Sequence, residues 1–158
     1  MESSPQSKPN EVSSHIAIIL VTVANLILII FFHEYIAWYI IEPGRNVTRL
    51  SILTDDYFIW LPIPIAASIL AIVAYTIMTV YDNYRFRMAA QIIVHIAGIF
   101  VVLSLVSIFP FDFSVIPNAT AIAAAPIGVT AFLIFMAVVY GVSGLVLFVR
   151  LIRSYTVK

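Results

Sequence analysis

The sequence predicts an all-α integral membrane protein, a single up-down bundle of four transmembrane helices. Of its 158 residues, 63% are hydrophobic and only 10% are charged, and the mean hydropathy is +1.09. Soluble domains are about 45–50% apolar and about 25% charged, so this composition excludes that class. Crossing roughly 30 Å of hydrocarbon takes about 20 apolar residues at about 1.5 Å per residue. Four stretches reach that length, at residues 16–41, 58–80, 88–109 and 127–149.

These stretches are apolar on every face, which distinguishes them from membrane strands. Transmembrane strands are about 9–11 residues long and alternate apolar with polar residues. Prolines support the helix boundaries, because only Pro62 and Pro64 fall within a span, in its first turns. The first N–H groups of a helix have no intrahelical acceptor, so proline is tolerated there. We therefore expect the second helix to begin near Leu61.

The chain is expected to form one membrane domain, residues 16–153, between two short tails. Residues 1–15 are polar and rich in Ser and Pro, and we expect them to be a disordered cytoplasmic tail. The apolar stretch that follows is too long for the core of a signal peptide, so we interpret it as an uncleaved anchor. Residues 154–158 form the second cytoplasmic tail.

Two connections define how the later helices are joined. Residues 81–87 form a tight hinge, which makes the second and third spans antiparallel neighbours. The connection after the third span contains residues 118–125, which are mostly small and apolar and are bracketed by prolines. Asn118 or Thr120 is a candidate helix cap there. We expect this segment to lie at the outer interface; the alternative is a re-entrant segment that lines a cavity.

Basic residues near the helix ends orient the chain. With both termini cytoplasmic, Arg45 and Arg49 lie outside, and six basic residues lie inside. These six are Lys8, Arg85, Arg87, Arg150, Arg153 and Lys158. The Asn-X-Ser/Thr sequons at Asn46 and Asn118 then fall one in each outer loop, so both asparagines are candidate glycosylation sites. We therefore expect a plasma membrane protein with both termini in the cytoplasm.

Polar residues inside the spans are the first candidates for a functional site, because they are costly at membrane depth. His95 lies about 10 Å from the cytoplasmic surface in the third span, and Asn25 lies about 13 Å deep in the first. The candidate layer consists of Asn25, Gln91, His95, Tyr140 and Ser143, with Tyr75 and Thr76 at the same level. Hydrogen bonding between helices explains such a layer. The alternative is a polar cavity for a proton, a quinone or a small solute.

His33 and Glu34 form a second candidate pair near the outer end of the first span. His33 lies roughly 25 Å from the start of the hydrocarbon at Ile16, which places the pair at the outer boundary. One interpretation is an interfacial pair wetted from outside, and the other is a proton-carrying or metal-binding pair. Neighbouring helical residues point about 100° apart, so these two side chains cannot easily hold one ion together.

No cofactor or metal can be assigned from the sequence. Cysteine is absent, which excludes disulfides, thiolate metal sites and Fe–S clusters. The two axial imidazoles of a haem must meet at one depth, whereas His33 and His95 differ by roughly 10 Å in depth. The sequence also contains no phosphate-binding Gly loop, HExxH pattern or GxSxG nucleophile.

The sequence favours a non-catalytic accessory or structural subunit of a larger membrane complex. Ala137, Gly141 and Gly144 share a small-residue face that suits close packing, within the bundle or against another subunit. Two alternatives remain: a small homo-oligomeric transporter or channel with the layer around Asn25 and His95 on its pathway, and a quinone- or redox-cofactor-binding subunit. The expected partners are the lipid bilayer and other membrane subunits or copies of the chain. Eight Lys and Arg balance eight Asp and Glu, so no basic excess exists to bind nucleic acid.

Overall fold

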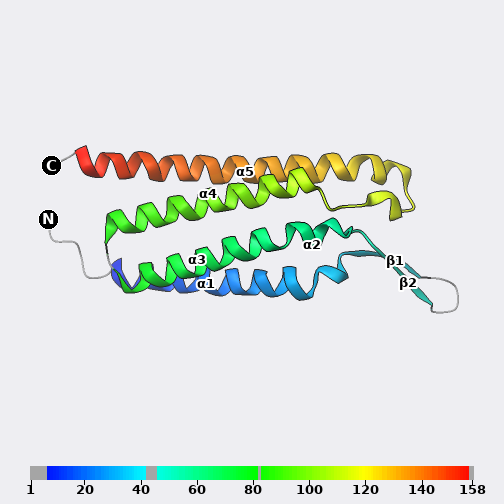
Figure 1. The fold of residues 1–158 in the computed structure, drawn as a ribbon, viewed down its shortest axis with the longest axis horizontal. Coiled ribbons are helices and arrows are strands. Elements are labelled where there is room, and N and C mark those ends of the chain that lie inside the picture. The colour runs from blue at the N-terminus through cyan, green and yellow to red at the C-terminus, as the bar shows by residue number, and fades with distance from the viewer. Residues whose placement is uncertain (1–6, 42–45, 82, 157–158) are drawn as a thin grey trace.

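The computed structural model describes residues 7–41, 46–81 and 83–156, and about 81% of them are helical. Four long helical segments lie along one axis and alternate in direction (Figure 1). Both chain termini lie at one end, hereafter the termini end, and a two-stranded hairpin lies at the other, the hairpin end. The elements in order are α1 (Ser7–Phe31), a 3-10 turn (His33–Tyr35), β1 (Ala37–Ile41), β2 (Val47–Ser51), α2 (Asp56–Trp60), α3 (Pro62–Val80), α4 (Tyr84–Ile108), a second 3-10 turn (Phe113–Val115) and α5 (Ala119–Thr156).

Four helical segments are long and apolar enough to cross a membrane. They are Val12–Phe31, Asp56–Val80, Tyr84–Ile108 and Ala119–Thr156. The second of these combines α2 with α3. The predicted number of apolar helices is therefore confirmed, while several of their limits differ from those that hydropathy alone predicts.

The first helix is shifted toward the N-terminus relative to the predicted span 16–41. It begins at Ser7, so residues 7–15 are helical rather than part of a disordered tail, and it ends at Phe31. Residues 37–41 belong to strand β1 instead. Their aromatic and β-branched side chains suit a strand as well as a helix, and hydropathy does not distinguish the two. Residues 1–6 and 157–158 of the predicted tails lie outside the described residues.

The hairpin pairs β1 with β2 in antiparallel register. Ala37 lies opposite Ser51, Tyr39 opposite Arg49 and Ile41 opposite Val47. This two-stranded element adds to an otherwise helical fold and replaces the last turns of the first predicted span. Hydrogen bonding between paired strands satisfies the backbone N–H and C=O groups that the end of a helix would leave exposed.

The two prolines of the second span divide it into α2 and α3. Pro62 and Pro64 have no N–H, so the helical hydrogen bonds that would begin at these residues are missing. The helical hydrogen bond just after them, from Ile65 N–H to the Leu61 carbonyl, is stretched to 3.4 Å. Helix α3 accordingly begins at Pro62, one residue after the expected start.

Helix α4 begins four residues earlier than the predicted span 88–109. The side chain of Asn83 accepts hydrogen bonds from the backbone N–H groups of Arg85 and Phe86, at 3.0 and 3.2 Å, and so caps the first turn. At the other end, Phe109 adopts a left-handed conformation with φ 44°, and its N–H donates to the Leu105 carbonyl. This left-handed residue ends the helix.

Helix α5 is much longer than the predicted span 127–149. Its 38 residues extend roughly 57 Å at about 1.5 Å per residue. Residues 119–125 form its first turns and continue through Pro126 into the same helix, so the alternative of a re-entrant segment is wrong. The alanines of this segment have the highest helix propensity, which favours its continuation. Asn118 is the cap, because its side chain accepts from the N–H groups of Thr120 and Ala121.

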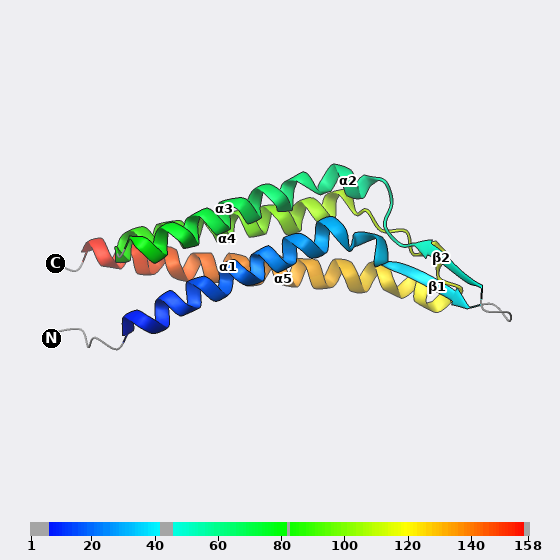
Figure 2. The same ribbon diagram turned by 90° about the horizontal axis from the view of Figure 1, so that it is seen from below.

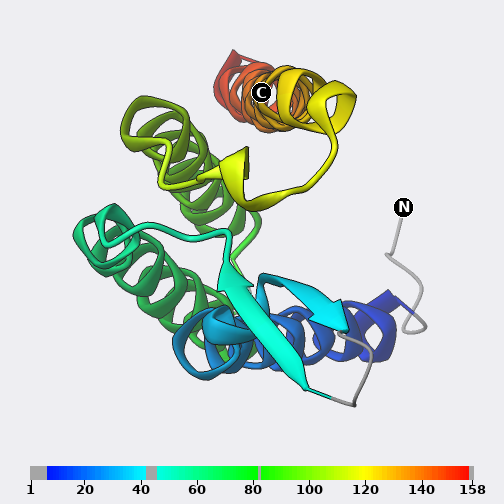
Figure 3. The ribbon, with the colours of Figure 1, turned by 90° about the vertical axis from the view of Figure 1, so that its right-hand side faces the viewer.

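The long helices pack in chain order as an open arc. Helix α1 packs on α3, α3 on α4, and α4 most extensively on α5. Viewed along the long axis, α1 and α5 lie at the two ends of this arc (Figure 3). Toward the termini end, α1 and the last turns of α5 run apart (Figure 2). The buried core lies on the concave side of α3 and α4 and includes Ala71, Tyr75, Met78 and Ala90.

Candidate functional site

A groove of about 520 Å³ follows the concave side of the arc and is lined by all four long helices. Three of the predicted site residues line it: Asn25 from α1, His95 from α4 and Tyr140 from α5. Helix α3 contributes Ser68 and Tyr75. The helices therefore bring Asn25 and Tyr140, which are 115 residues apart in sequence, to one groove.

His95 has a defined hydrogen-bonding state on one side of its ring. Its Nδ1 lies 2.7 Å from the backbone carbonyl of Gln91. A carbonyl only accepts, so Nδ1 carries the proton, and in the neutral ring Nε2 is left as an acceptor. The ring meets Tyr140 edge to face, with centroids 6.0 Å apart and planes at 75°. His95 therefore lines the groove with its Nε2 outside this hydrogen bond.

Glycines allow α4 and α5 to approach closely beside His95. A Cβ atom built at Gly144 would lie 3.5 Å from His95 Cβ, and one built at Gly98 would lie 2.9 Å from Tyr140 Cε1. Gly144 belongs to the predicted small-residue face, and this contact uses it within the fold. Gly141 has no atom within 4 Å of its built Cβ, so it faces away from described neighbours. Close packing inside the fold thus accounts for part of that face.

Asn25 lies at the edge of the groove and is exposed. Within the described residues, no hydrogen bond joins its amide to His95 or Tyr140. The hydroxyl of Thr22, one turn away, donates a hydrogen bond to the Ile18 carbonyl of its own helix. Among the described residues, Asn25 and Thr22 therefore line the groove without a hydrogen bond to α4 or α5.

Two predicted members of the layer lie outside this groove. Gln91 lines a separate pocket at the termini end, and Ser143 is half-buried elsewhere on α5. In α3, Tyr75 is buried, whereas Thr76 is exposed and donates its hydroxyl to the Ile72 carbonyl. Rise along a helix fixes the depth of a residue, but its direction around the axis decides which side chains meet.

His33 and Glu34 diverge at the hairpin end. The His33 ring stacks on Tyr57 with centroids 5.1 Å apart, and its Nδ1 donates to the Ile30 carbonyl. Glu34 instead lies 3.6 Å from the Arg49 guanidinium on β2, and this carboxylate is 65% exposed. Such an exposed ion pair contributes little to stability, about 0–1 kcal/mol. The two residues have separate partners, as the 100° angle between neighbours predicts.

The two sequon asparagines lie at the hairpin end, opposite the termini. Asn46 precedes β2 and Asn118 precedes α5, and both are exposed (Figure 1). Asn118 uses its Oδ1 as the α5 cap, which leaves its Nδ2 outside those hydrogen bonds. Both candidate glycosylation sites thus lie on one end of the molecule.

His15 is a polar residue that the sequence does not single out as part of a site. It is 7% exposed, its ring lies 5.7 Å from that of Tyr75, and its Nδ1 has no hydrogen-bond partner among the described residues. Hydropathy places it outside the membrane, because the apolar stretch begins at the next residue. The available signal is helical spacing: His15 shares a face with Ile18 and Ile19, which pack against the core on α3.

Within the described part of the chain, no group of three or more His, Cys, Asp or Glu residues is placed to hold a metal ion. Comparison of the chain with protein-family models, curated proteins and solved structures returns no match. The site must therefore be interpreted from its own geometry.

Proposed function

We propose that this chain is a non-catalytic subunit of an integral membrane complex, in which a helix of another subunit closes the open side of the arc. The observation that carries this proposal is the polar groove between α1 and α5, which are not packed against each other. Polar side chains facing hydrocarbon are costly and are covered by protein in membrane bundles. A partner helix would supply that cover and the hydrogen-bond partners that the side chains of Asn25 and Tyr140 do not find among the described residues.

The exposure of α5 supports the same proposal. Of its described residues, only Leu133 is buried within the chain. Lipid covers apolar side chains without a partner protein, but it offers nothing to Tyr140 or His95 on the concave side. The groove, rather than the apolar outer faces, is therefore the proposed contact surface.

For the membrane orientation we propose that the termini end is cytoplasmic and that the membrane is the plasma membrane. Arg85 and Arg87 lie in the first turn of α4, and Arg150 and Arg153 lie in the last turns of α5. These helix ends are at the termini end, which agrees with the positive-inside rule. Asn46 and Asn118 lie at the opposite end, where glycosylation would act.

Site-specific crosslinking tests the proposed complex. A photoreactive residue replaces Val21, which lines the groove, or Ile69, which is exposed on α3 outside it. In native membranes, the position 21 variant should form a product with a different polypeptide, and the position 69 variant should not. A protein that purifies as a solitary monomer in both mild detergent and lipid, with no product from position 21, contradicts the proposal.

A second candidate is a homo-oligomeric transporter or channel, favoured by the acceptor that His95 presents to the groove. Four helices alone seldom enclose a water path, so this function requires several copies of the chain. The same crosslinking would then join position 21 to another copy. Proteoliposome flux should fall in His95→Ala, and flux that is unchanged in this variant argues against a pathway through His95.

A further inference from the structure

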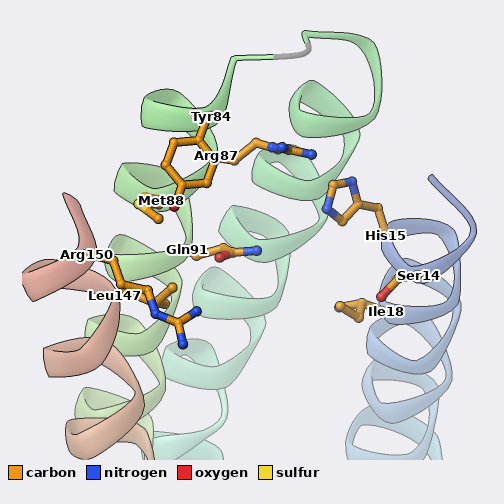
Figure 4. Close-up of a pocket in the computed structure, with 9 residues that line it drawn as sticks. All are labelled: Ser14, His15, Ile18, Tyr84, Arg87, Met88, Gln91, Leu147 and Arg150. Carbon is orange, nitrogen blue, oxygen red and sulfur yellow. The ribbon is translucent and has the colours of Figure 1, made fainter. Parts of the chain in front are cut away.

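A second pocket, of about 300 Å³, opens at the termini end between α1, α4 and α5. It differs from the groove in its chemistry. Arg87 and Gln91 extend from α4 toward α1, which carries His15, and Arg150 lies on the α5 side (Figure 4). None of the nine lining residues is acidic. The lining therefore combines the Arg150 guanidinium, the Gln91 amide and the His15 imidazole, with Arg87 in the same wall.

His15 is a buried polar residue in the wall of this pocket. The side chain is 93% buried, yet its Nδ1 has no hydrogen-bond partner within the described residues. Buried polar atoms in proteins are nearly always hydrogen-bonded, because leaving one unpaired is costly. The tilted contact with Tyr75 packs the ring but gives its nitrogens no partner. Nδ1 itself is closed off from the pocket, so a bound group would meet the ring through Nε2.

The level of the pocket along the helices and its apolar lining indicate what kind of molecule carries the bound group. Ile18, Met88 and Leu147 line it alongside the polar residues, and Ile18 also lines the groove. His15 and Arg150 lie at the ends of the apolar stretches of their helices, which is the level of lipid headgroups. An anionic headgroup with an acyl chain matches this combination of basic and apolar walls.

We propose that this pocket binds the phosphate group of an anionic phospholipid. The Arg150 guanidinium is the main ligand, because a guanidinium presents paired N–H donors that match phosphate oxygens. Gln91 adds amide donors, and His15 donates through Nε2 in the tautomer that carries the proton on that atom. Arg87 also interacts elsewhere in the chain, and only its place in the wall enters the proposal. This site adjoins the groove at Ile18 but does not depend on the proposed function.

Native mass spectrometry and thermal unfolding of the full chain in nonionic detergent test this site. The probes are phosphatidylglycerol, phosphatidylcholine and inorganic phosphate. We expect phosphatidylglycerol to remain bound and to raise the unfolding temperature, whereas phosphatidylcholine and inorganic phosphate do neither. Stabilisation by inorganic phosphate equal to that by phosphatidylglycerol overturns the lipid as the source of the phosphate group.

Arg150→Gln and Arg153→Gln form a matched pair of variants. Both arginines are exposed on the last turns of α5, but only Arg150 lines the pocket. We expect Arg150→Gln to weaken phosphatidylglycerol binding about tenfold, or about 1.4 kcal/mol, and Arg153→Gln to change it less than about twofold. Equal losses in the two variants, or no loss in Arg150→Gln, overturn the assignment of the pocket. His15→Phe, which keeps a ring against Tyr75, should also weaken binding.

Discussion

The ring of Tyr140 lies so close to the backbone of Gly98 that a Cβ atom at position 98 would be 2.9 Å from Tyr140 Cε1 and 3.0 Å from Cδ1. Cβ atoms do not approach ring carbons this closely without a shift of one partner. The glycine therefore allows the ring of Tyr140 to occupy its place beside His95 in the groove. The contact between α4 and α5 and the shape of the groove therefore both depend on the absence of a side chain at Gly98.

Gly98→Ala should displace the Tyr140 ring and destabilise the α4–α5 contact. Overpacking of this kind costs about 1–3 kcal/mol, with the lower end expected because the ring can rotate. The unfolding temperature in mild detergent measures the effect. Gly141→Ala is the control, because no atom lies within 4 Å of its built Cβ. That control should be neutral or stabilising, since alanine favours a helix over glycine. Equal stability of the two variants would show that the ring is not constrained by position 98.

A hydrogen bond joins α2 to the end of α1. The Tyr57 hydroxyl donates a 2.6 Å hydrogen bond to the Ile29 carbonyl. Tyr57→Phe removes this bond and should lower the free energy of unfolding by about 0.5–1.5 kcal/mol. Tyr39→Phe, in the exposed part of β1, should leave it unchanged. Chemical or thermal unfolding in detergent compares the two variants. A Tyr57→Phe protein as stable as wild type would show that this hydrogen bond does not stabilise the fold.

Trp60 makes the corresponding link to α4. Its Nε1 donates toward the Ser104 hydroxyl at 3.2 Å and the Val101 carbonyl at 3.3 Å, and the ring is 7% exposed. Trp60→Phe removes both bonds and part of the ring, so it should cost about 1–2 kcal/mol. Ser104→Ala leaves the carbonyl as an acceptor and should cost about half as much. If Ser104→Ala is the more destabilising of the two in thermal unfolding, Trp60 is not the centre of this contact.

The number of apolar helices and the position of the proline break are predictable from the sequence, because both follow from local chemistry. Hydrocarbon thickness fixes the length of an apolar helix, and Pro62 lacks an N–H wherever the chain places it. The end of α1 at Phe31 is not predictable in this way. Residues 37–41 are apolar in either a helix or a strand, and only pairing with β2 favours the strand.

The candidate site was predictable in depth but not in direction. Asn25, His95 and Tyr140 reach one groove because rise along each helix places them at similar levels. Gln91 and Ser143 share that depth range but point elsewhere, since the rotation of each helix depends on its neighbours. His15 is buried only because α1 extends beyond the apolar stretch and packs on Tyr75. The local signal of this packing is limited to the helical spacing of His15 with Ile18 and Ile19.

Asp112 gives the fold a pH-dependent contact outside the spans. Hydrogen bonds from Ser114, through its side chain and its backbone N–H, hold the pKa of the Asp112 carboxyl below its ordinary value. Its backbone N–H also donates to the Ile52 carbonyl at 2.7 Å, which attaches this loop to the segment before α2. The charged carboxylate therefore strengthens the contact between Asp112 and Ser114, in a loop at the hairpin end of the molecule.

Because the folded pKa is depressed, the stabilisation from Asp112 is present above the unfolded pKa of about 3.9 and is lost as pH falls through the lower folded pKa. An NMR titration of the Ser114 amide should show a midpoint below 3.9. Asp112→Asn keeps an accepting oxygen without a titrating group, so its Ser114 amide should not respond over this range. A wild-type midpoint at or above the ordinary value for Asp would mean that Ser114 does not favour the ionised carboxylate.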